Sequence, residues 1–196
     1  MCTNGTAITA CTSNDNCCPT GCQGDDMMLA NYDLDCASCD WTAGVFPFNH
    51  QASSIGDMTF DAQCDLYYAT DADNVFKVNR NTAAPQLLSS FSGNVRGIVY
   101  HPGTNLIYVT NVAKIFSMTK GGGNVTQLPS SNTASYLNGM TVAPPGWGTH
   151  GGKLIAARSN GDVVAFDTST GQPTVVGSIG GSQLSDVEFD GNTLYV

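Results

Sequence analysis

Basic residues are scarce in this 196-residue sequence, in which seven Lys and Arg stand against 16 Asp and Glu and give a formal net charge of −9. The protein is therefore a poor candidate for a nucleic-acid binder, because phosphate contacts depend on Lys and Arg. No apolar run approaches the roughly 20 residues of a membrane-spanning helix, so we expect no membrane span. Glu188 is the only glutamate, and the other acids are aspartates, which favour turns over helix faces. These shortages indicate short strands joined by turns.

Cysteine is absent after residue 64, whereas the first third of the chain contains eight: Cys2, Cys11, Cys17, Cys18, Cys22, Cys36, Cys39 and Cys64. An even number of clustered cysteines favours disulfide bonds and an oxidising compartment, so we expect an extracellular or cell-surface protein. Residues 1–53 show no apolar periodicity, and we interpret them as a small, irregular, disulfide-rich module and linker. If all eight cysteines pair within the chain, Cys64 must bond one of the seven that precede residue 40.

The cysteine-rich segment also contains candidate ligand positions. Asp33 and Asp35 belong to a segment of alternating oxygen-bearing side chains that could bind Ca²⁺. The glycine and distal glutamate of an EF-hand are missing, however, and an acidic turn with solvent-facing aspartates is the favoured interpretation. Cys36 and Cys39 form a CxxC pair, for which a redox or zinc role is an alternative to a disulfide. Two glycosylation sequons begin at Asn4 and Asn124, the second in an expected hairpin.

A short strand, Leu106–Asn111, recurs along the rest of the chain at a spacing of about 40 residues. Each complete repeat contains four short strand-like segments separated by turn residues, which is the content of one β-propeller blade. Residues 54–196 therefore predict an all-β fold of about three and a half blades of four antiparallel strands each. The expected blades cover residues 55–93, 94–134, 135–181 and, incompletely, 182–196.

One copy of the strand contains Tyr108-Val109-Thr110-Asn111, preceded by His101-Pro-Gly-Thr-Asn-Leu-Ile. This segment resembles YVTN- and NHL-type propeller repeats, whereas Tyr68-Ala-Thr-Asp71 and Ala156-Ala-Arg-Ser159 depart from the motif. The string Asn14–Cys22, with Asp33–Cys36 downstream, resembles cysteine-rich modules of bacterial surface proteins. The resemblance implies a six- or seven-bladed propeller, of a kind often exported or found on microbial surfaces, that acts as a binding or structural module.

A propeller with this repeat length needs about 250–300 residues to close. Residues 54–196 are therefore expected to be part of a larger propeller. The start of the sequence shows no secretory leader, so we expect either that the numbering begins after a removed leader or that the sequence is an excerpt of a longer protein. Self-association through an open blade edge is an alternative way to complete such a structure.

The residues that flank the innermost strands are the candidate channel residues: Asp57, Arg96, Asn138 and Asp186. Asp57, Asn138 and Asp186 loosely resemble the metal ligands of propeller sugar-lactone hydrolases, in which a divalent ion such as Ca²⁺ activates water. Arg96 argues against a simple cation site. His50, His101 and His150 fall in expected turns without the spacing of metal ligands, and no nucleophile motif occurs.

We therefore expect a structural or binding protein at the cell surface, such as a surface-layer, adhesive or filament component, with protein or glycan partners. A metal-dependent propeller hydrolase is the alternative. The chain is more consistent with a non-enzymatic role, because no catalytic constellation is visible in the sequence.

Overall fold

The computed structural model describes residues 54–79, 84–181 and 183–196. Predictions for residues 1–53, including the cysteine-rich module, Asn4, Asp33 and Asp35, lie outside the described residues. The described residues form three four-stranded sheets, one two-stranded sheet and a short 3-10 helix. No helix among them is long and apolar enough to cross a membrane.

The first sheet contains β1 (Ile55–Phe60), β2 (Leu66–Thr70), β3 (Asn74–Val78) and β4 (Pro85–Ser90). The second contains β5 (Val95–His101), β6 (Leu106–Asn111), β7 (Lys114–Met118) and β8 (Thr126–Gln127). The third contains β9 (Leu137–Val142), β10 (Leu154–Arg158), β11 (Asp162–Phe166) and β12 (Pro173–Ser178), and the last contains β13 (Glu188–Asp190) and β14 (Thr193–Tyr195). Helix η2 (Gly148–His150) lies between β9 and β10.

Every strand pairs antiparallel with its neighbour in the sequence, so each sheet is a simple up-and-down meander. The predicted all-β fold of four-stranded antiparallel blades is confirmed. The tight turns explain why these strands pair in order. Between β5 and β6, Asn105 adopts a positive φ of 55° and donates its backbone N–H to the carbonyl of His101.

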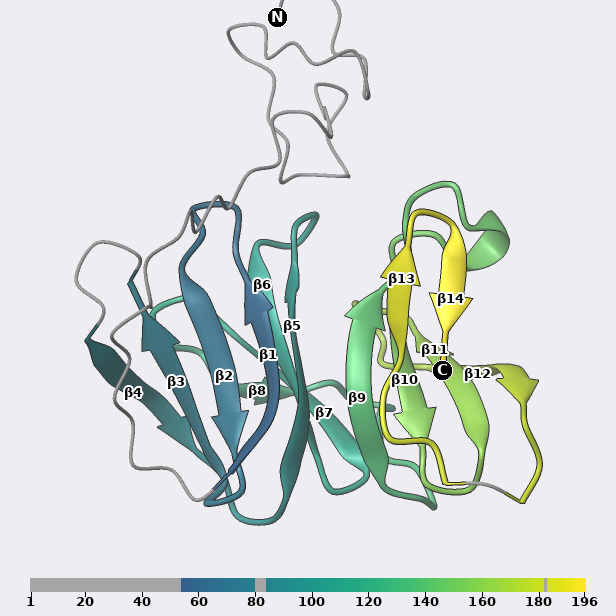
Figure 1. Ribbon diagram of the computed structural model, residues 1–196, viewed down its shortest axis with the longest axis horizontal. Coiled ribbons are helices and arrows are strands. Elements are labelled where there is room, and N and C mark those ends of the chain that lie inside the picture. The colour runs from purple at the N-terminus through teal and green to yellow at the C-terminus, as the bar shows by residue number, and fades with distance from the viewer. Residues whose placement is uncertain (1–53, 80–83, 182) are drawn as a thin grey trace, which may run out of the picture.

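The first strands of the four sheets lie next to one another. Figure 1 shows β1, β5, β9 and β13 side by side across the molecule, with the later strands of each sheet extending away from them. Direct contacts join β1 to β5, β5 to β9 and β9 to β13. The sheets therefore fan out from a row of inner strands, as propeller blades do.

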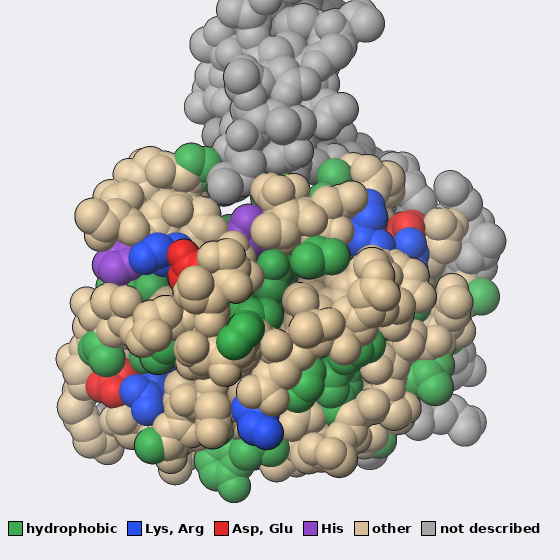
Figure 2. Space-filling model, turned by 180° about the vertical axis from the view of Figure 1, so that it is seen from behind, with side chains coloured by type: hydrophobic (Ala, Val, Ile, Leu, Met, Phe, Trp, Pro, Cys, Tyr) green, Lys and Arg blue, Asp and Glu red, His purple; other side chains and the backbone are tan. Residues whose placement is uncertain are grey.

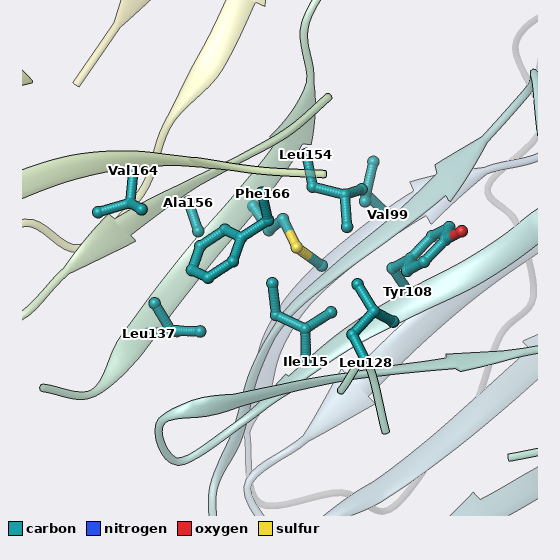
Figure 3. Packing of buried hydrophobic residues seen from close by; sticks show 10 residues of the cluster. Val99, Tyr108, Ile115, Leu128, Leu137, Leu154, Ala156, Val164 and Phe166 are labelled. Carbon is teal, nitrogen blue, oxygen red and sulfur yellow. The ribbon is translucent and has the colours of Figure 1, made fainter. Parts of the chain in front are cut away.

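The core consists of apolar layers between successive sheets. On β6, Ile107 and Val109 pack toward the first sheet, whereas Tyr108 between them packs toward the third. Figure 3 shows the layer between the second and third sheets, with Tyr108 and Ile115 facing Leu154 and Phe166. Because successive side chains of a strand point to opposite faces, a blade covered on both sides requires apolar residues at consecutive positions. This is why β6 begins with four consecutive apolar or aromatic residues, Leu106–Val109.

A third apolar layer joins the third sheet to the two-stranded sheet. Ile155 and Ala157 of β10 contribute to it, together with Val187 just before β13. Burial of each large aliphatic side chain in these layers stabilises the fold by about 1.5–3 kcal/mol. The two-stranded sheet is therefore attached to the rest of the structure by the same kind of packing as the complete blades.

One interpretation from the sequence is wrong. His101 is not a surface turn residue, because it is the last residue of β5 and its side chain is buried. Its Nδ1 accepts the backbone N–H of Thr104, so Nε2 carries the proton and donates to the carbonyl of Gly152 at 2.8 Å. The histidine thus links the second blade to the long loop of the third.

Candidate functional site

The predicted channel residues lie at the ends where the inner strands begin. Arg96 Nη1 donates a hydrogen bond to Asn138 Oδ1 at 3.2 Å, and Asn138 Nδ2 donates to the carbonyl of Leu184. The guanidinium of Arg96 also lies 5.8 Å from the ring centre of Tyr136. Both amide atoms of Asn138 are therefore engaged in a chain of contacts that joins the second, third and last sheets.

Asp57 is also used to connect blades. Its Oδ2 accepts the backbone N–H of Ile98 on β5 at 2.9 Å, and its Oδ1 accepts the N–H of Met58. The pKa of Asp57 is raised to about 7, chiefly by burial; the two N–H donors lower it, and the negative charges of Asp186 and Glu188 raise it. The structure therefore brings Asp57 and Asp186 into one electrostatic environment.

Two glycines allow the inner strands to approach closely, and the sequence reasoning missed their role. A Cβ on Gly97 would lie 2.5 Å from the carbonyl oxygen of Asn138, and a Cβ on Gly139 would lie 1.7 Å from Asp186 Oδ1. In both cases the obstructing residue belongs to the next blade. Gly97 and Gly139 occupy equivalent positions in two successive repeats, and this recurrence is the sequence signal that could have identified the close approach of the blades.

The predicted metal site is not tested by these contacts. Within the described ranges, no three His, Cys, Asp or Glu side chains are placed to hold a metal ion together. Asp57 and Asn138 use their side-chain oxygens in the hydrogen bonds given above. The assignment of Asp57, Asn138 and Asp186 as metal ligands stays a prediction, as does glycosylation of Asn124, an exposed residue with a positive φ of 54°.

Cys64 lies in the turn between β1 and β2. Its side chain is 3% exposed and takes part in a disulfide bond. The seven other cysteines lie outside the described residues, so the predicted pairing stays a prediction.

A cavity of about 250 Å³ lies at the opposite ends of the inner strands, where they finish. Every sheet contributes to its wall, and the long loop after β9 adds Ala143 and Pro145. Most of the wall is apolar or aromatic, and the only ionisable carboxyl group in it is that of Glu188. The lining residues are Phe60, Val99, Tyr100, Pro102, Thr141, Val142, Ala143, Pro145, Glu188 and Phe189.

Glu188 is solvent-accessible and its contacts are few. Its Oε1 accepts the hydroxyl of Thr141 at 3.4 Å and the backbone N–H of Phe189 at 3.2 Å. Desolvation by the surrounding strands raises the pKa of the Glu188 carboxyl, and the charge of Asp186 acts in the same direction. No Lys or Arg forms an ion pair with Glu188 in the part of the chain that the structure describes. The cavity therefore presents one uncompensated acid among apolar groups.

Two lysines elsewhere in the structure are each held by a carboxylate together with an aromatic ring. Lys77 Nζ lies 2.6 Å from Asp65 and 5.3 Å from the ring centre of Tyr67. Lys120 Nζ lies 3.2 Å from Asp61 and 5.6 Å from the ring centre of Tyr100. On the face shown in Figure 2, several of the charged side chains likewise occur in small groups with both signs adjacent.

Comparison with solved structures identifies the fold. A chain in the crystal structure of a nidogen/laminin complex superposes with a TM-score of 0.62 and 14% sequence identity, over 73% of this chain and 56% of that chain. An auxiliary nutrient binding protein from Bacteroides thetaiotaomicron gives a TM-score of 0.57 and 18% identity, over 71% of this chain and 34% of that chain. The fold is that of β-propeller blades.

The chain spans about half of the first of these structures and a third of the second. No protein-family model matches the sequence, and no curated protein matches it. The similarity therefore identifies the fold, while the specific repeat type is not identified by it.

Proposed function

We propose that this chain is part of a YVTN/NHL-type propeller that acts as a binding module at the cell surface or outside the cell. The observation that carries the proposal is the cavity at which all four inner strands finish. Propeller strands from several blades converge there, so a ligand at this place contacts every sheet at once. Binding sites in proteins are concave, largely apolar and supplied with a few polar groups, as this cavity is.

The size of the cavity limits what enters it. Its volume of about 250 Å³ is slightly below the range of roughly 300–1,000 Å³ that holds a drug-sized ligand. A single side chain or a small polar group therefore fits inside, while the rest of a larger partner rests on the surrounding loops. This favours a protein or glycan partner that inserts one group into the cavity.

The location outside the cell is supported by the eight clustered cysteines and by the disulfide bond at Cys64. The two structural neighbours are a protein from a nidogen/laminin complex and a nutrient binding protein, so one takes part in a protein complex and the other is a binding protein. A surface-layer, adhesive or filament component meets these requirements. Assembly through self-association is one form that such a component could take.

The experiment combines surface binding with a test of hydrolysis. The purified, oxidised chain is labelled and titrated onto intact cells and envelope fragments of the source organism, and we expect saturable binding that unlabelled chain displaces. In parallel, chelator-treated protein is assayed on a panel of sugar lactones with and without added Ca²⁺. We expect no metal-dependent turnover. Metal-dependent hydrolysis that is lost in Asp57→Ala, together with no surface binding, would replace the proposal by the hydrolase alternative.

A further inference from the structure

The acidic cavity at the ends of the inner strands has a specific ligand chemistry. We propose that it binds an alkylammonium group, with the carboxylate of Glu188 as counterion and the aromatic residues of the wall around the alkyl chain. The inference rests on the proposed function, because it names the ligand class of the same cavity.

The wall combines the groups that bind ammonium cations. Phe60, Tyr100 and Phe189 supply aromatic rings, and Glu188 supplies a single negative charge. Phe189 is fixed by an edge-on contact with Trp147, whose ring centre lies 4.9 Å away. Aromatic rings attract cations through the negative faces of their π-systems, and such rings with a nearby acid bind alkylammonium ligands. The remaining wall is aliphatic and suits a methylene chain.

Glu188 is the only charged side chain in the cavity wall, and Lys120 lies over the ring of the wall residue Tyr100. Asp57 and Asp186, toward the other ends of the inner strands, are close enough to Glu188 for the negative charges to repel one another. A cation bound beside Glu188 relieves this repulsion, whereas an anion adds to it. The formal net charge of −9 also draws cations toward the molecule.

The structure already contains the same arrangement twice, with its own lysines as ligands. Lys77 is held by Asp65 and the Tyr67 ring, and Lys120 is held by Asp61 and the Tyr100 ring. Glu188 shares the cavity wall with aromatic residues and forms no ion pair with a Lys or Arg of the described chain, since Lys120, which lies over the Tyr100 ring, is paired with Asp61. An ammonium group from outside the described chain completes the third site.

The probes are n-butylamine, which is protonated at neutral pH, and n-butanol, which has a similar shape without the charge. The second pair is a short peptide whose only charged group is one central lysine, and the same peptide with norleucine in place of that lysine. Isothermal titration calorimetry measures binding to the wild-type chain, to Glu188→Gln and to Asp190→Asn. Asp190 is the matched control, because it is an exposed acid of the same strand outside the cavity wall.

We expect n-butylamine to bind the wild-type chain and Asp190→Asn with equal affinity, and n-butanol to bind more weakly. Glu188→Gln should weaken n-butylamine binding by about tenfold or more, because a charge-assisted contact is lost. Tighter binding of the lysine peptide than of n-butylamine identifies a protein side chain as the source of the ammonium group, and the reverse identifies a free amine. Circular dichroism and thermal unfolding check that both variants fold.

Equal binding of n-butanol and n-butylamine, unchanged affinity in Glu188→Gln, or no binding of any probe overturns the proposal. Failure of the ammonium inference can be distinguished from failure of the proposed surface role. If cells bind the wild-type chain and Glu188→Gln equally, only the ammonium inference is wrong. If n-butylamine binds through Glu188 but no cell surface does, the surface role is wrong and the ligand chemistry remains.

Discussion

Replacement of Gly139 by alanine tests the close packing of the inner strands. The new Cβ would lie 1.7 Å from Oδ1 and 2.8 Å from Cα of Asp186. The carboxylate can rotate away, but the Cα belongs to the backbone of the segment before β13. Restoring an ordinary contact of 3.4 Å requires a shift of about 0.6 Å in that backbone. Overpacking of this kind costs about 1–3 kcal/mol, so Gly139→Ala should destabilise the fold by this amount.

Urea unfolding followed by circular dichroism measures the effect, with Gly177→Ala as the matched control. Gly177 lies in β12 of the same sheet, and a Cβ there meets no atom within 4 Å. Its replacement should change the unfolding free energy by less than about 1 kcal/mol, because only the freedom of the unfolded chain is reduced. Asp186→Ala combined with Gly139→Ala should restore only part of the loss, since the backbone contact persists. Equal stability of the two single glycine variants would refute the close approach of the blades.

Three further predictions concern the core, the buried acid and the disulfide. Phe166→Ala should cost about 3–5 kcal/mol in urea unfolding, because the ring is fully buried between the second and third sheets; a cost below about 1 kcal/mol would contradict this packing. The folded-state pKa of Asp57, about 7, lies above its ordinary value of 3.8, so its protonation stabilises the native state at low pH and this contribution is lost as pH rises through about 7. Asp57→Asn should therefore gain stability relative to wild type between about pH 4 and about pH 8, and a pH-independent difference would argue against a raised pKa. Peptide maps with and without reductant should show Cys64 joined to a cysteine of the first 40 residues. A free Cys64 thiol would contradict the predicted pairing.

Much of the fold could be predicted because its signals are local. The recurring segment Leu106–Asn111 is predicted as a strand, and the structure has a strand with these bounds. The turn residues between such segments and the repeat spacing of about 40 residues predict the four-stranded sheets. His101 was misread because its neighbours Pro102 and Gly103 indicate a turn, whereas its ring is buried by the distant loop at Gly152.

The site could be predicted only in part. The sequence places Asp57, Arg96 and Asn138 at the starts of the inner strands, but it does not show that they hydrogen-bond to the next blade. The cavity was missed, because Tyr100 and Glu188 are far apart in the sequence and meet only after the blades pack. Its one early signal was the single glutamate in a chain rich in aspartate.

Photocrosslinking tests most directly whether the partner binds at the cavity. A photoreactive phenylalanine is placed at Pro145 in the cavity wall and, as the control, at Val175, an exposed residue of β12. After binding to the surface of the source organism and irradiation, the position-145 variant should form a covalent adduct with the partner, and the position-175 variant should not. An adduct from position 175 with none from position 145 would contradict binding at the ends of the inner strands.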